Sequence, residues 1–150
     1  MMHTITVASP VGPLTLAESD GALVRITFRD DGACDCTPLL TEAARQLEEY
    51  FAGSRRDFDL PLAPAGTPFQ QEVWLALRKI PYGQTHSYKD IACAIGRPKA
   101  CRAVGMANNR NPLPIVIPCH RVVGVSGALT GYAGGLEIKD ALLRLEIPNF

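Results

Sequence analysis

Residues 87–108 read SYKDIACAIGRPKACRAVGMAN and contain two short helix patterns separated by a glycine. The first pattern begins at the N-cap residue Ser87, has an acid three positions later, and predicts a helix over residues 88–95. Gly96 ends this helix, and a proline opens a second helix that is predicted over residues 98–108. Two short helices joined in this way are typical of a helix-turn-helix, the motif that places its second helix on DNA.

The chain before this motif predicts another helix and a small β unit. Thr67, followed by a proline and then by Gln70, has the pattern of a capping box and begins a helix. Farther upstream, runs of alternating apolar residues predict three antiparallel strands, and apolar residues at helical spacing predict a helix at 38–52. The strands are expected at residues 4–8, 14–18 and 22–28.

A segment rich in proline, alanine and aspartate, residues 54–66, divides the chain into two parts. We expect a β/α domain with its linker over residues 1–66 and a DNA-binding domain over residues 67–150. In the second domain, Ile115-Val116-Ile117 predicts a short buried strand, and a last helix is expected over residues 136–145. The expected fold class is α+β: a small N-terminal antiparallel β unit with a helix, then a mainly helical unit with the helix-turn-helix.

The composition is that of a globular protein, since 47% of the 150 residues are hydrophobic. No run reaches the roughly 20 apolar residues of a membrane span, and the first residues lack the pattern of a secretory signal. Five cysteines, of which only Cys34 and Cys36 are close together, argue against a disulfide framework and favour the reducing cytoplasm. With only the distant His3 beside them, this Cys-x-Cys pair has poor zinc spacing, so we expect no metal and no cofactor.

The formal net charge is zero, yet the charge is unevenly distributed along the chain. Residues 1–72 carry five basic and eleven acidic side chains, whereas residues 73–150 carry ten basic and four acidic ones. From Arg78 to Arg110 there are seven basic side chains and a single acid, Asp90. A basic face of this kind suits contact with phosphates, although runs of charge are also common on faces that meet only solvent.

The chemistry is expected at Cys119, within the run Pro118-Cys119-His120-Arg121-Val122. A lone cysteine after three aliphatic residues is ordinarily a small buried hydrophobe. Here, however, His120 is adjacent, and Glu146 becomes available if the last helix packs on the predicted strand. A thiol needs a base to become the reactive thiolate, and the base needs a partner that orients it. These three residues therefore form a candidate nucleophilic site.

The pentapeptide resembles the active-site signature of the O6-alkylguanine-DNA alkyltransferases, also called methylated-DNA–protein-cysteine methyltransferases. Further motifs match the order and spacing of that family across residues 67–146, whereas the N-terminal β segment resembles it only loosely. These motifs are Ile80-Pro81-Tyr82-Gly83, Ser87-Tyr88, Pro98-Lys99, Arg102-Ala103-Val104-Gly105, Asn111-Pro112, Ser126-Gly127, and Tyr132 with Gly134-Gly135. The resemblance implies a DNA repair enzyme that moves an alkyl group from O6 of guanine onto its own cysteine, once and irreversibly.

The resemblance also implies roles for individual residues. Cys119 is the alkyl acceptor, His120 takes the thiol proton through a water, and Glu146 holds the histidine by a charge-assisted hydrogen bond. Asn111 fixes the turn before the active-site strand. Tyr88 donates a hydrogen bond to the purine ring and so lowers the cost of charge on the departing guanine.

The DNA contacts are likewise implied by the resemblance. Arg102 fills the gap left by a flipped-out base, and its small neighbours Ala103 and Gly105 suit a helix in the minor groove. Backbone amides near Cys119 and in Tyr132–Gly134 bind the base. The implied partner is double-stranded DNA containing O6-alkylguanine, bound with little dependence on sequence. The protein is expected to act as a cytoplasmic monomer with no membrane contact and no obligate protein partner.

Three other functions fit parts of the sequence. A non-catalytic sensor of alkylated bases with the same fold lacks the acceptor cysteine, which this chain has. A cysteine hydrolase requires an oxyanion site and usually a histidine placed elsewhere in the chain. A transcriptional regulator would explain the basic helix-turn-helix but not the surroundings of Cys119.

Overall fold

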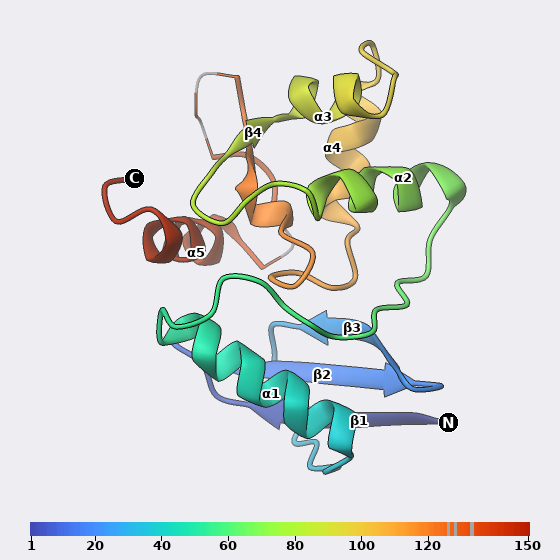
Figure 1. Cartoon of the computed structure of the whole chain (residues 1–150), viewed down its shortest axis with the longest axis vertical. Helices are drawn as coiled ribbons and strands as arrows, with labels where there is room; N and C mark the ends of the chain where they lie inside the picture. Colours follow the sequence, from blue (N-terminus) through green and yellow to red (C-terminus); the bar gives the residue numbers. More distant parts are fainter. Residues whose placement is uncertain (126, 128, 133) are drawn as a thin grey trace. The chain divides into compact units, whose positions relative to one another are not determined.

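The computed structural model describes residues 1–125, 127, 129–132 and 134–150. Two residues named above, Ser126 of one family motif and Ala133 within the proposed base contact, lie outside the described residues. The chain folds into two compact units, Met1–Ala65 and Gly66–Phe150, each with its own helices and strands (Figure 1).

The N-terminal unit is an antiparallel sheet with one helix, as predicted (Figure 1). Its elements are β1 (Met2–Val7), β2 (Leu14–Ser19), β3 (Ala22–Thr27) and α1 (Pro38–Phe51). The strand order is β1-β2-β3, so that Leu16 in the central strand lies between Ile5 and Ile26. The helix begins after Thr37, whose side chain accepts a hydrogen bond from the backbone amide of Leu40.

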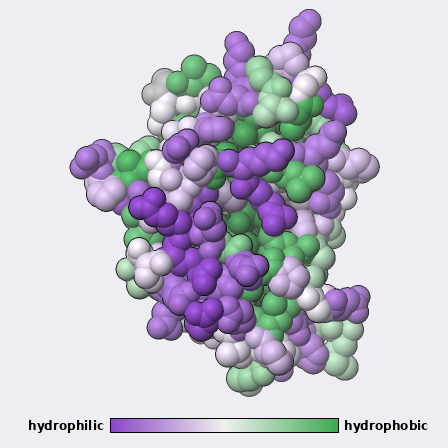
Figure 2. All heavy atoms as spheres, in the orientation of Figure 1, coloured by the Kyte–Doolittle hydropathy of each residue, from purple (hydrophilic) through white to green (hydrophobic). Residues whose placement is uncertain are grey.

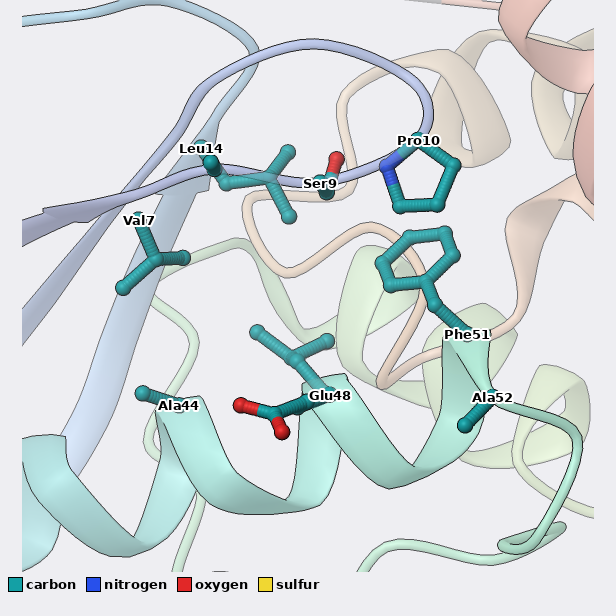
Figure 3. Close-up of a pocket in the computed structure, with 10 residues that line it drawn as sticks. Val7, Ser9, Pro10, Leu14, Ala44, Glu48, Phe51 and Ala52 are labelled. Carbon is teal, nitrogen blue, oxygen red and sulfur yellow. The ribbon is translucent and has the colours of Figure 1, made fainter.

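A cavity of about 530 Å³ lies between α1 and the turn that joins β1 to β2 (Figure 3). Its walls are mostly apolar, and the ring of Phe51 on α1 faces Pro10 in the turn. The polar side chains at this cavity are Glu48 and Ser9, whose hydroxyl donates to the carbonyl of Gly12. Neither cysteine nor histidine is among the described residues that line it.

The C-terminal unit is mainly helical and contains one short parallel sheet. Its elements are α2 (Pro68–Leu77), β4 (His86–Ser87), α3 (Tyr88–Ala94), α4 (Cys101–Asn109), the 3-10 turn η1 (Cys119–Arg121), β5 (Val122–Val123) and α5 (Leu136–Glu146). Complete capping boxes begin α2 and α3, formed by Thr67 with Gln70 and by Ser87 with Asp90. The helices α3 and α4 pack against each other and form the predicted helix-turn-helix.

The short sheet places the start of α3 beside the residues that follow Cys119. His86 of β4 pairs with Val122 of β5, and Ser87 pairs with Val123. Because Ser87 also caps α3, the position of Tyr88 relative to η1 is fixed by backbone hydrogen bonds.

The predicted strand at residues 115–117 is wrong. Residues 112–117 form bends and turns, and Ile115 adopts a positive φ of 74°, which is rare for a β-branched residue. The side chain of Asn111 closes this loop, since its Nδ2 donates to the carbonyl of Ile117 at 2.8 Å and its Oδ1 accepts from the amide of Leu113 at 3.0 Å. Cys119 consequently follows a closed loop and lies in a 3-10 turn rather than on a strand.

The second helix of the helix-turn-helix begins at Cys101, three residues after the predicted start at Pro98. The intervening backbone forms a turn in which the amide of Ala100 donates to the carbonyl of Arg97 at 2.9 Å. No side chain caps this helix. The sequence therefore has no capping signal at the true start, and the prediction based on the proline placed the start too early.

The α+β fold class is confirmed. Hydrophilic side chains cover much of the face shown in Figure 2, with apolar residues between them. Among the described residues, no helix is both long enough and apolar enough to cross a membrane.

Candidate active site

Cys119 begins the turn η1 and is almost completely buried, with 4% of its surface exposed. Its amide donates to the carbonyl of Ile117 at 2.7 Å. Burial raises the pKa of the thiol to about 11, although the side chain of Asn111 and the charge of Lys139 act in the opposite direction. The resting group is therefore a neutral thiol, which needs a base before it can act as a nucleophile.

His120 is the next residue of the turn and is fully buried. Its Nε2 lies 2.7 Å from Oε2 of Glu146, whereas its Nδ1 has no hydrogen-bond partner among the described residues. Burial lowers the pKa of the imidazole below its ordinary value of 6.5, despite the opposing effect of Glu146. The ring is therefore neutral at about pH 7.

Glu146 is the last residue of α5, and its carboxylate accepts hydrogen bonds from two side chains and one backbone amide. Burial alone would raise its pKa, but the hydrogen bonds from His120 and Arg121 and the charge of Arg121 lower the pKa to about 2. An ionised carboxylate can only accept, so Nε2 of His120 must carry the ring proton. The lone pair then lies on Nδ1, which makes this atom the basic nitrogen of the site.

Arg121 connects this carboxylate to the segment before α3. Its Nε donates to Oε1 of Glu146 at 2.8 Å and its Nη2 to Oε2 at 3.1 Å, which is the bidentate geometry of a strong pair. Its Nη1 donates to the carbonyl of Ile80 at 2.7 Å, and its guanidinium lies 5.7 Å from the ring centre of Tyr82. The amide of Gly83 donates to Oε1 of Glu146 at 3.2 Å. Ile80 and Gly83, the first and last residues of one of the motifs named above, are thus hydrogen-bonded to Arg121 and Glu146.

Two buried asparagines hold the backbone around Cys119. Asn111 closes the preceding loop, as described above. Asn108, on α4, donates from its Nδ2 to the carbonyl of Cys119 at 3.3 Å, while its Oδ1 has no partner among the described residues. The helix predicted to lie on DNA is therefore bonded directly to the backbone of Cys119.

A groove of about 600 Å³ lies where α3, α4 and the segment after β5 meet. Tyr88, Arg102 and Gly105 line it together, so the structure brings these three predicted residues to one surface. The Tyr88 hydroxyl lies 2.7 Å from Oγ1 of Thr130, which lines the same groove. Cys101 also lines the groove and is a free cysteine of intermediate exposure.

The remaining predicted DNA-contact residues, Ala103, Tyr132 and Gly134, are not among the described residues that line this groove. Ala103 lines a neighbouring hollow with Met106 and Arg110 rather than the groove. Tyr132 contributes a side-chain hydrogen bond that lowers the pKa of Cys119. Gly134 lies in the turn before α5. The structure thus gathers Cys119, His120, Glu146 and Asn111 in one buried cluster.

Sequence reasoning missed several residues of this cluster. Arg121 was named only as part of the pentapeptide, whereas it is the bidentate partner of Glu146. Asn108 and Lys139 were not identified, although both are buried. The only sequence signal for them is helical spacing: Lys139 lies seven residues before Glu146 and hence on the same face of α5.

The five cysteines are free, and Cys34 and Cys36 are exposed. Within the part of the chain that the structure describes, no group of three His, Cys, Asp or Glu residues is arranged to hold a metal ion.

Comparison with known proteins assigns both units to one family. The family model for the 6-O-methylguanine DNA methyltransferase ribonuclease-like domain matches residues 2–64. The model for the DNA-binding domain of the same methyltransferase matches residues 68–147. This chain belongs to the 6-O-methylguanine DNA methyltransferase family. The resemblance inferred from the motifs is thereby confirmed.

Members of this family from distant organisms are similar over nearly their whole length. A methylated-DNA–protein-cysteine methyltransferase of Methanosarcina barkeri is 52% identical and is matched over 99% of both chains. A constitutive one of Bacillus subtilis is 51% identical, over 97% of this chain and 96% of its own. The crystal structure of Mycobacterium tuberculosis OGT in complex with DNA superposes with a TM-score of 0.89 at 49% identity, covering 96% of this chain and 92% of that one.

We predict that Asn108→Leu destabilises the protein by roughly 1–3 kcal/mol, because the buried carbonyl of Cys119 loses its donor. Urea unfolding monitored by tryptophan fluorescence measures this change. The control is Asn109→Leu, at an exposed position of the same helix, which is expected to shift stability by less than about 0.5 kcal/mol. Equal losses in the two variants would show that the bond from Asn108 does not brace the site.

Proposed function

We propose that this chain repairs DNA by transferring the alkyl group of an O6-alkylguanine to the sulfur of Cys119, once per molecule. Family membership supports the class of reaction. The observation that carries the assignment to Cys119 is its burial beside a neutral His120 whose Nε2 is bound to Glu146 and whose Nδ1 is left with its lone pair. This is the arrangement in which a histidine can take a proton from a thiol.

In the proposed reaction, the thiol proton passes to Nδ1 of His120 through a bridging water, and Glu146 stabilises the imidazolium that forms. A sulfur electron pair then forms the S–C bond while the C–O6 bond breaks in line, and its electrons pass to the purine. A hydrogen bond from Tyr88 stabilises this charge. The released guanine takes up one proton. Thiol and alkylguanine thus become thioether and guanine, without a cofactor.

The transfer is expected to be irreversible. The product is a thioether, which water does not hydrolyse under neutral conditions, so the reaction regenerates no thiol. Each molecule therefore repairs one base. The reducing cytoplasm, where we place the protein, keeps Cys119 available as a thiol before that single use.

We further propose that the groove lined by Tyr88, Arg102 and Gly105 receives the damaged nucleotide. A base that stays stacked in a duplex cannot reach a buried sulfur, so the base must flip out. Arg102, exposed on α4, would occupy the space it leaves. Binding would depend mainly on phosphates and little on sequence. One chain holds all of these residues, so we expect a monomer to suffice.

Intact-mass spectrometry after mixing the protein with a duplex that contains one O6-methylguanine tests the transfer. We predict the gain of one methyl group per molecule, mapped to the tryptic peptide of residues 111–121, in which Cys119 is the only cysteine. Cys119→Ser should gain none, whereas Cys101→Ser, which removes the thiol in the groove, should gain a full equivalent.

The alternatives give different results in the same experiment. No methyl gain with tight binding of the duplex would favour a sensor of alkylated bases. No gain and no binding would refute the proposed function, and a methyl group on Cys101 would refute the assignment of the acceptor.

Base flipping predicts a specific defect in Arg102→Ala. A duplex with 2-aminopurine next to the alkylated guanine should brighten on binding the native protein, because the fluorophore loses a stacking partner. Arg102→Ala should reduce this change and slow methyl transfer about tenfold or more. The control, Lys99→Ala, removes a neighbouring exposed charge and should weaken binding without changing the fluorescence of the saturated complex. Equal fluorescence of native and Arg102→Ala complexes would exclude this role.

A further inference from the structure

Lys139 is a fully buried lysine on α5 that the proposed reaction does not use. Its Nζ donates to the carbonyl of Thr130 at 2.6 Å, and among the described residues no carboxylate lies within ion-pair distance of it. A buried ammonium is costly unless an opposite charge or several hydrogen bonds replace its hydration. A single neutral acceptor does not replace the hydration of an ammonium, so we expect a second group to stabilise the charge of Lys139.

The charges packed around Lys139 leave one candidate. The turn η1, which packs on α5, contributes Cys119, His120 and Arg121, and α5 itself contributes Glu146. Glu146 is already matched by the bidentate guanidinium of Arg121. His120 is neutral at rest and becomes positive when it takes a proton, so it cannot balance an ammonium. Cys119 is the remaining group of this set that can acquire a negative charge.

We propose that the buried ammonium of Lys139 is the counter-charge of the Cys119 thiolate. The electrostatic coupling between the two groups supports this, because the charge of Lys139 lowers the pKa of Cys119 and Cys119 raises that of Lys139. Lys139 transfers no proton and forms no bond to the substrate. It stabilises the sulfur while the proton resides on His120, and its charge is unbalanced again once the sulfur is alkylated.

The same lysine also fixes the rim of the groove. Thr130, whose carbonyl accepts from Lys139, has its hydroxyl 2.7 Å from the hydroxyl of Tyr88. A purely structural role for Lys139, tethering this segment, is therefore the competing explanation. The two roles differ in pH dependence, because only the electrostatic role requires the ammonium to be charged.

The reactivity of Cys119 toward iodoacetamide separates these explanations without DNA. The rate is obtained from the carbamidomethylation of peptide 111–121 in the native protein and in Lys139→Met, which removes the charge at similar volume. Burial lowers the pKa of Lys139 from 10.5 to about 8. The ammonium is therefore charged at about pH 7 and largely neutral at about pH 9.5. We predict that the native protein reacts about tenfold or more faster than Lys139→Met at about pH 7, and that this ratio falls toward one at about pH 9.5.

Two further variants complete the test. Lys139→Arg keeps a charge that does not titrate in this range, so its advantage over Lys139→Met should persist at about pH 9.5. Arg144→Met, at an exposed position of the same helix, should react like the native protein. Lys139→Met should keep or raise the thermal midpoint, because the cost of burying a charge is removed.

A ratio near one at both pH values, or the same deficit at both, would overturn the proposal in favour of a structural role. The mechanistic part of the inference rests on the proposed function and is tested by methyl transfer from the O6-methylguanine duplex at about pH 7. Lys139→Met should slow this transfer by the same factor as the iodoacetamide reaction. If the native protein transferred no methyl group while the iodoacetamide ratio behaved as predicted, the proposed function would fail and the charge pairing would stand.

Discussion

The carboxylate of Glu146 joins the end of α5 to the turn that carries Cys119. It accepts hydrogen bonds from His120, Arg121 and the amide of Gly83, and this set fixes which nitrogen of the histidine is basic. It also balances a buried guanidinium whose Nη1 donates to the carbonyl of Ile80. Removing the carboxylate would leave a buried positive charge without its partner, a change that typically costs about 3–5 kcal/mol. The position of the base and the packing of the unit therefore depend on the same group.

Beside this ion pair lies the proposed nucleophile, the thiol of Cys119, whose pKa is raised by burial. Because burial raises this pKa to about 11, the thiol is protonated near pH 7. Such a thiol is protected from incidental oxidation and alkylation, which matters for a group proposed to react once. Activation then requires a local base and a local positive charge, and the buried His120 and Lys139 have these properties.

The sequence predicted the elements whose signals are local. Thr67 and Ser87 carry capping boxes, so the starts of α2 and α3 were predicted correctly from a few residues. The run at residues 115–117 was misread because apolar composition does not distinguish a strand from a buried loop. That loop is closed by a side chain, Asn111, whose bonds reach across six residues. Lysine is usually found on the surface, so its residue type gave no reason to predict that Lys139 is buried.

The protonation of His120 is the most direct test of the proposed transfer, because that reaction begins with a proton moving to its Nδ1. Side-chain ¹⁵N chemical shifts of the free protein, measured by NMR at about pH 7, report which ring nitrogen carries the proton. We predict a neutral ring with the proton on Nε2, facing Glu146, and a bare Nδ1. A proton on Nδ1, either in the other neutral tautomer or in an imidazolium, would contradict the proposed mechanism, since Nδ1 would then be unable to accept the proton of Cys119.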